Sequence, residues 1–193
     1  MARSIAFNRE EVLDKAVQVF WAKGYEATSM QDLVDAMGIQ RGSLYGTFGG
    51  KQRLFLTALN RYGDVVVKSL LSLLESEPSA KDSINSFFAQ LVEHLMTAGP
   101  LRSCLVTNSA IERGLTDEAT REKIFSLLNA IEKGFYQALL RARENNEIST
   151  NIDLTATAYY LTSSMQGLIV MGKICHDRSV LESINQMTLS IFE

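Results

Sequence analysis

The sequence is poor in the residues that interrupt helices, cross-link secreted domains or bind metals. It contains two prolines, two cysteines and two histidines among 193 residues. Because proline inside a helix costs about 3 kcal/mol, its scarcity leaves room for long helices. Cys104 and Cys175 form neither a disulfide framework nor a zinc-ligand spacing, and His94 and His176 share no ligand spacing. We therefore expect no bound metal and no cofactor.

Long hydrophobic runs and catalytic constellations are also missing. The most apolar stretch, residues 167–172, is far too short to span a bilayer, and the first residues lead into a charged segment rather than a signal-peptide core. No nucleophile, base or paired-carboxylate arrangement stands out, so we expect no catalytic residues and no enzyme. The simplest expectation is a cytoplasmic protein without a membrane partner.

The whole chain carries little net charge, but its two parts have net charges of opposite sign. The net charge is −3. Residues 1–61 hold eight Lys or Arg and six Asp or Glu, whereas the remaining 132 residues hold eleven and sixteen. A mildly basic head on an acidic body suits a protein that docks on DNA by one end, although ordinary scatter would produce the same asymmetry.

Apolar residues recur at helical spacing along the chain. We count about nine helices, no convincing strand and no internal repeat, which predicts an all-α protein. One periodic pattern runs from Leu54 to Leu73 and includes Val65 and Val66 in its apolar stripe. This helix is too long for a small head alone. We therefore predict two parts, a head over residues 1–50 and a second domain over residues 51–193.

The most informative segment is residues 28–48, which reads as two short helices about a glycine turn. Thr28 and Gln31 have capping-box spacing, and an apolar stripe leads to Gly38, where a left-handed residue ends the first helix. The second helix carries exposed hydrogen-bonding groups, with Leu44 and Phe48 expected in the core. A positioning helix, a tight turn and a polar second helix form a helix-turn-helix, whose expected role is reading DNA.

Recognition helices meet base edges with their N-terminal residues. Gln40 can pair with adenine, and Arg41 with guanine or a phosphate. Other polar residues are placed to contact phosphates, which position a protein without reading sequence. The alternative for each residue is a solvated helix surface. The full set of expected DNA contacts is Thr28, Ser29, Gln40, Arg41, Ser43, Tyr45, Thr47 and Lys51.

The segment and its flanks resemble the TetR family of transcriptional regulators over roughly residues 5–60. The resemblance rests on the first-helix residues Ala16, Phe20, Gly24 and Tyr25, on residues 28–30 and 39–45, and on residues 48–55. It implies that residues 1–50 are a three-helix DNA-binding domain and that residues 51–193 are a ligand-binding and dimerisation domain, linked to the head by a fourth helix. The implied dimer interface is built from the last two helices, near residues 153–172 and 178–192. Gly46 departs from the family pattern, because relatives often carry a larger residue there that reaches the DNA backbone.

The body also contains apolar faces with a few polar groups, which predict an effector pocket, although most residues at such spacing are ordinary core. Asn108 and Gln166 are the better candidates, because amides on apolar faces need partners. The expected pocket residues are Phe87, Phe88, Met96, Cys104, Asn108, Ile111, Phe125, Tyr159, Met165 and Gln166.

Together these features predict a DNA-binding protein. The resemblance implies a one-component regulator, a repressor that binds a palindromic operator in double-stranded DNA as a homodimer and is released by a small-molecule effector. The alternative is a redox- or electrophile-responsive regulator with Cys104 as its switch, which requires an accessible thiol with a lowered pKa. Two further functional classes are a small helical enzyme and a helical adaptor that binds only protein.

Overall fold

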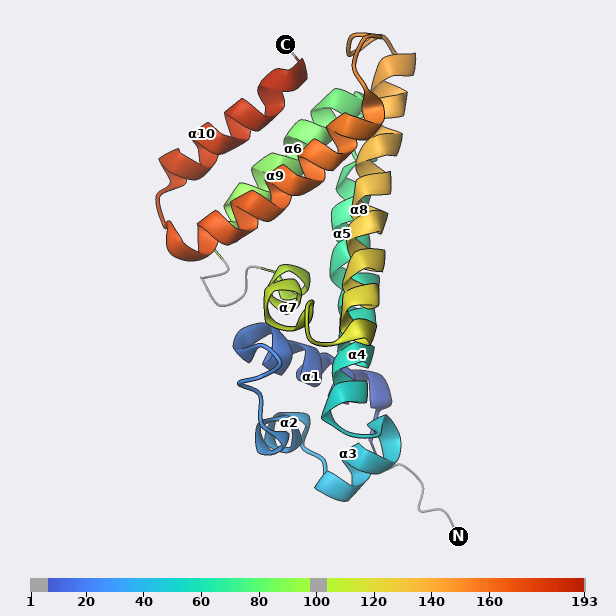
Figure 1. Ribbon diagram of the computed structural model, residues 1–193, viewed down its shortest axis with the longest axis vertical. Coiled ribbons are helices and arrows are strands. Elements are labelled where there is room, and N and C mark those ends of the chain that lie inside the picture. The colour runs from blue at the N-terminus through green and yellow to red at the C-terminus, as the bar shows by residue number, and fades with distance from the viewer. Residues whose placement is uncertain (1–6, 98–103, 193) are drawn as a thin grey trace. The chain divides into compact units, whose positions relative to one another are not determined.

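The computed structural model describes residues 7–97 and 104–192, and all regular structure within these ranges is helical (Figure 1). The all-α prediction is confirmed. The elements are α1 (Arg9–Lys23), α2 (Met30–Met37), α3 (Arg41–Phe48), α4 (Lys51–Tyr62), the π-helix η1 (Gly63–Val67), α5 (Lys68–Leu73), α6 (Ala80–Thr97), α7 (Leu105–Arg113), α8 (Glu118–Glu144), α9 (Leu154–Ile174), α10 (Arg178–Leu189) and a final 3₁₀ turn, η3 (Ser190–Phe192). When α4, η1 and α5 are taken as the one predicted helix, nine helices result for the described residues.

The chain forms two compact units, and their division does not follow the predicted boundary at residue 50. The first unit contains the described residues up to Val65 together with Cys104–Ile124, and the second contains the rest. Thus α4 and α7, which lie in the predicted second domain, belong to the first unit. A linear sequence pattern does not reveal this, because α7 is separated from the head by more than forty residues of other structure.

In the first unit, α1 packs on α2 and α4 around an aromatic core. The Phe20 ring meets the Phe55 ring edge to face, with centroids 5.0 Å apart. Leu33 and Met37 of α2 and Leu44 of α3 are also fully buried. Burying such side chains contributes about 1.5–3 kcal/mol each, and this burial holds the two short helices in place.

The helix-turn-helix forms as predicted, with one correction at its start. The N-cap of α2 is Ser29, not Thr28, and the capping box joins Ser29 to Asp32 rather than Thr28 to Gln31. The carboxylate of Asp32 accepts from the backbone N–H of Ser29 at 2.8 Å. Gly38 ends α2 at φ 67°, in the left-handed region, as its position after the apolar stripe predicts.

The long helix that follows the head is interrupted by the π-helix η1. A π turn accommodates an extra residue, so the apolar stripe changes phase at this point. Val65, expected on the stripe, is 50% exposed, whereas Val67 is buried. The prediction of one regular α-helix was therefore wrong over these five residues.

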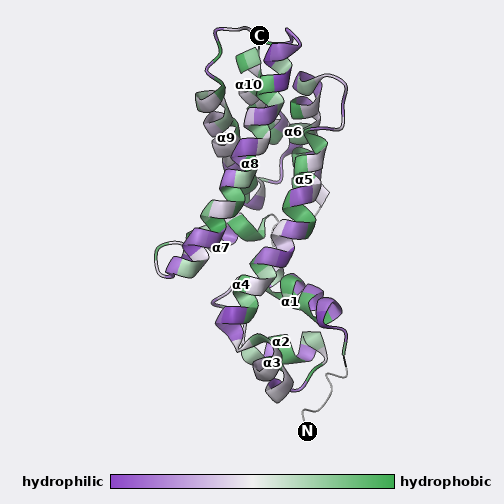
Figure 2. Cartoon of the chain, turned by 90° about the vertical axis from the view of Figure 1, so that its right-hand side faces the viewer, coloured by the Kyte–Doolittle hydropathy of each residue, from purple (hydrophilic) through white to green (hydrophobic). Residues whose placement is uncertain are grey.

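In the second unit, α6 packs on α9 and α10, and a second aromatic cluster lies at its core. The rings of Phe87 and Phe135 meet edge to face at 5.0 Å, and Phe88 stacks against Phe135 at 5.8 Å. Glu147 closes the start of α6 by accepting from the backbone N–H of Lys81 at 2.8 Å. Hydrophobic and hydrophilic residues alternate along α8 (Figure 2), as expected for a helix with one buried face. Among the described residues, no helix is both long and apolar enough to cross a membrane.

Candidate nucleic-acid interface and effector pocket

The helix α3 has one buried face and one exposed polar face. Leu44 and Phe48 are buried in the core of the first unit, as predicted. The opposite face presents Gln40, Arg41 and Tyr45, and the Tyr45 side chain is 49% exposed. Gln40 is the N-cap of α3 but makes no side-chain capping bond. Its amide is therefore not committed to the helix start and is able to contact a base edge.

The other predicted DNA contacts differ in how much surface they offer. Ser43 and Thr47 are half-buried beside the exposed face. Ser29 is exposed, but its hydroxyl is engaged with the Asp32 carboxylate at 2.8 Å. Thr28 is 1% exposed, and its hydroxyl donates to the carbonyl oxygen of Gly24 at 2.5 Å. The Thr28 side chain therefore closes a turn and has no exposed surface with which to meet a phosphate.

Lys51 stands at the start of α4, where its ammonium lies over the Tyr25 ring, 4.2 Å from the centroid. The Arg113 guanidinium also lies over this ring, at 4.4 Å. Burial raises the pKa of Tyr25, and the charge of Arg113 partly opposes that effect. The phenol is thus neutral at pH 7 and presents an aromatic face to two cations.

Two further cations flank α3 and were missed by sequence reasoning. Arg9 and Arg53, both exposed, border a hollow of about 500 Å³ at the C-terminal end of α3. The guanidinium of Arg9 lies 5.3 Å from the centre of the Phe48 ring. The two arginines belong to α1 and α4, outside the segment that carries the motif, so only the packing of these helices around α3 brings them together. The hollow is lined by Arg9, Tyr45, Gly46, Thr47, Phe48, Gly49, Arg53, Leu56 and Thr57.

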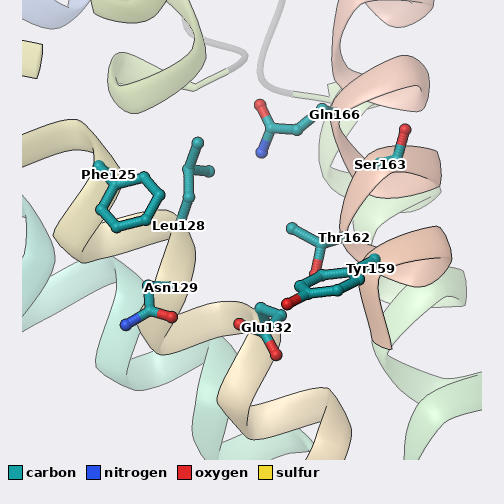
Figure 3. A pocket seen from close by; sticks show the side chains of 8 residues that line it. All are labelled: Phe125, Leu128, Asn129, Glu132, Tyr159, Thr162, Ser163 and Gln166. Carbon is teal, nitrogen blue, oxygen red and sulfur yellow. The ribbon is translucent and has the colours of Figure 1, made fainter. Parts of the chain in front are cut away.

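The second unit contains a pocket of about 370 Å³ between α8 and α9 (Figure 3). It is lined by Phe125, Leu128, Asn129, Glu132, Tyr159, Thr162, Ser163 and Gln166. Three of the ten predicted pocket residues are among them: Phe125, Tyr159 and Gln166. Sequence reasoning missed the polar members of α8, because a polar residue on a helix reads as solvated surface until the facing helix is known.

The remaining predicted pocket residues lie outside this pocket. Phe87 and Phe88 are core residues packed against the Phe135 ring, and Met165 is also buried. Met96 is half-buried near the end of α6. Cys104, Asn108 and Ile111 belong to the first unit, where Ile111 is exposed. Phe87, Phe88 and Met165 are thus packed in the core, and the structure does not bring them to this pocket.

Cys104 is the N-cap of α7 and is buried. The hydroxyl of Tyr62 donates to its sulfur at 3.8 Å. Burial raises the pKa of Tyr62 well above its ordinary value, so this hydroxyl keeps its proton at neutral pH. A thiol in this setting lacks the exposure that a reactive cysteine needs. Cys175, at the end of α9, is half-buried.

Comparison with known proteins agrees with this geometry. Residues 12–58 match the family described as bacterial regulatory proteins of the tetR family, and residues 80–188 match the tetracyclin repressor-like C-terminal domain. The chain belongs to the TetR family. Its members are transcriptional regulators, so the resemblance noted in the sequence is confirmed.

Individual TetR-family relatives span nearly the whole chain. The chain is 34% identical to the HTH-type transcriptional regulator YezE of Bacillus subtilis over 100% of both proteins. It is 29% identical to the repressor ComR of Escherichia coli, over 89% of this chain and 82% of that protein. Among solved structures, a cysteine-substituted variant of the TetR-family regulator CifR with a 26-bp operator duplex aligns with a TM-score of 0.87 and 27% identity, over 99% of this chain and 100% of CifR.

Proposed function

We propose that this TetR-family regulator is a cytoplasmic repressor that binds a palindromic operator as a homodimer and is released by a small-molecule effector. The observation that carries the DNA-binding part is the exposed polar face of α3, with Gln40 and Arg41 at its start and arginines on either side of its far end. CifR, which has the same fold, is bound to operator DNA in its solved structure, and ComR is named a repressor.

On this proposal some residues contact base edges and others contact phosphates. Gln40 and Arg41 lie in the first turn of α3 and read base edges in the major groove. Tyr45, Lys51, Arg9 and Arg53 contact phosphates, which set the register without specifying sequence. Ser43 and Thr47 support these contacts from the half-buried edge of the helix.

Dimerisation uses α9 and α10. These helices expose large apolar side chains, which are costly to leave in water: Tyr160, Val170, Met171, Ile174 and Met187. Gly167 lies between them on α9 with open space around it, so a second backbone can approach closely. A dimer formed here would present two α3 helices about one helical turn of DNA apart, on the order of 34–36 Å.

Effector binding uses the pocket between α8 and α9. Its size, about 370 Å³, falls in the range of small-molecule sites, and its lining combines aromatic rings with a few polar groups. An effector that favours a conformation with the wrong α3 spacing would reduce operator affinity, and a coupling of roughly 1–3 kcal/mol suffices for useful derepression.

The test is selection of preferred sequences from a random duplex library by the purified protein, followed by titration of the best site. We expect a palindromic consensus bound by a dimer. Gln40→Ala and Arg41→Ala should relax preference at individual base pairs, while Arg53→Ala should weaken binding to all duplexes and lower the salt slope by about one. A selection that yields no preferred sequence, or binding by monomers only, would contradict the proposal.

A further inference from the structure

The pocket between α8 and α9 is built from two helix faces with the same spacing. Phe125, Leu128, Asn129 and Glu132 follow one another on α8 at intervals of three, one and three residues, and Tyr159, Thr162, Ser163 and Gln166 repeat this pattern on α9. Residues at this spacing lie on one face of a helix. In Figure 3 the two sets of side chains face each other across the pocket.

Each face contributes one aromatic ring that is left largely uncovered. The Phe125 side chain is 71% exposed and that of Tyr159 is 60% exposed. Rings of this size bury large apolar areas when they are covered, so their exposure beside a pocket marks a surface that gains from a ligand. Their faces also carry negative electrostatic potential, which attracts cations.

The pocket also carries a negative formal charge. Glu132 is the one ionisable acid or base with formal charge at pH 7 among the eight lining residues, and it carries a negative charge. In the part of the chain that the structure describes, its carboxylate forms no ion pair. In Figure 3 the Glu132 and Tyr159 side chains lie toward the same end of the pocket.

We propose that this pocket binds organic cations, in which a quaternary or protonated nitrogen lies near Glu132 and Tyr159 and an attached apolar group contacts Phe125 and Leu128. This inference rests on the proposed function, since it names the chemical class of the effector. Glu132 and Phe125 are separated by two helical turns, about 10 Å, which matches a cation linked to one aromatic ring.

The polar groups between Glu132 and Phe125 orient a bound ligand but add no charge to the pocket. The hydroxyl of Thr162 donates to the carbonyl oxygen of Ala158, so its oxygen remains an acceptor. The Asn129 amide and the Ser163 hydroxyl also line the pocket. These groups accept hydrogen bonds from a protonated amine, whereas an anionic ligand would meet the Glu132 carboxylate with no positive side chain among the eight lining residues to offset it.

The test uses two ligands of nearly equal shape that differ in charge: phenyltrimethylammonium and its neutral isostere tert-butylbenzene. Binding of each to the full-length protein is measured by ligand-observed NMR titration. We expect saturable binding of the ammonium compound and weaker binding of the neutral one. Glu132→Gln, which keeps the side-chain shape, should weaken ammonium binding about 5-fold and leave tert-butylbenzene unaffected, as expected for one partly exposed charge pair.

Matched variants separate charge in the pocket from charge elsewhere. Glu144→Gln removes an exposed carboxylate from α8 outside the pocket and should have no effect. Tyr159→Leu should weaken binding of the ammonium compound, whereas Tyr159→Phe keeps the ring and should preserve it. Circular dichroism of each variant confirms that it is folded.

Equal affinity for the two ligands, binding of neither, or an unchanged affinity in the Glu132→Gln variant would overturn the inference. Operator binding, measured on the same preparations, reports separately on the proposed function. A protein that binds its operator but not the cation disproves only the effector class, whereas a protein that binds no operator disproves the proposed function itself.

Discussion

The carboxylate of Glu112, on α7, accepts hydrogen bonds from the backbone N–H groups of Tyr25 and Glu26, each at 2.8 Å. The next residue, Arg113, pairs with the Glu26 carboxylate at 2.9 Å and covers the Tyr25 ring. The turn between α1 and α2 is therefore held by side chains that come from a helix more than eighty residues later in the sequence. Through these contacts, α7 takes part in the DNA-binding unit.

Glu112→Ala should lower the free energy of unfolding by about 1 kcal/mol, because two N–H groups lose their acceptor and one of them is partly buried. It should also accelerate hydrogen exchange at the Tyr25 and Glu26 amides before exchange elsewhere in α1 changes. Urea denaturation and exchange measured by NMR check the two effects. Glu122→Ala, at an exposed position on α8, is the control, and equal effects of the two variants would show that Glu112 does not hold the turn.

Gly46→Ala should stabilise the protein by about 1 kcal/mol, because glycine in a helix interior is less favourable than alanine by that amount. A Cβ atom at Gly46 meets nothing within 4 Å, so the new methyl group fits without strain. Thermal denaturation measures the gain.

Gly46→Lys adds a charge at the same exposed position, next to the expected DNA backbone. We expect tighter operator binding and a salt slope steeper by about one than in Gly46→Ala. Fluorescence anisotropy at several salt concentrations measures this difference. Identical slopes in the two variants would place residue 46 away from the phosphates.

Treatment with N-ethylmaleimide should leave operator binding unchanged in the unmodified sequence as well as in Cys104→Ser. The buried thiol beside the Tyr62 hydroxyl is shielded from the reagent, whereas Cys175 is half-buried and should react first. Mass spectrometry of modified peptides gives the order of reaction, with Cys175→Ser as the control. If the reagent abolishes operator binding in the unmodified sequence but not in Cys104→Ser, the electrophile-sensing alternative is correct.

Asp32 makes the stability of the helix-turn-helix depend on pH. A hydrogen bond from the Lys23 ammonium, with further bonds from Ser29, holds the pKa of Asp32 well below its ordinary value. A carboxyl whose pKa is lower in the folded state stabilises the fold above its unfolded pKa, near 4, and this contribution is lost as the pH falls. The difference in unfolding free energy between the unmodified protein and Asp32→Asn should therefore shrink below about pH 4. Urea denaturation between pH 7 and pH 3 measures it, with Asp35→Asn on the same helix as the matched control.

Features that depend on short stretches of sequence were predicted well. The exposed face of α3 and the turn at Gly38 follow from helical spacing and from one residue with special backbone freedom. The capping box was misplaced by one residue because Thr28 and Ser29 are both good N-cap residues. Only the packed turn shows that the Thr28 hydroxyl is already bound to Gly24.

Features that depend on distant segments were not predicted. Arg9 and Arg53 gain their place beside α3 from the packing of three helices. The pocket between α8 and α9 forms only where residues of two different helices, among them Glu132 and Tyr159, come together. The π-helix at Gly63–Val67 leaves no composition signal, since its valines fit either helical register.

The ammonium of Lys51 over the Tyr25 ring has a consequence for the thermodynamics of DNA binding. A free lysine loses up to about 2 kcal/mol of rotational freedom when it becomes fixed on a partner. Lys51 is already restrained in the absence of DNA, so the phosphate contact proposed for it should carry a smaller entropic penalty than that of a mobile surface lysine. The Tyr25 ring thus preorganises the Lys51 side chain for a phosphate that would contact the lysine but not the tyrosine.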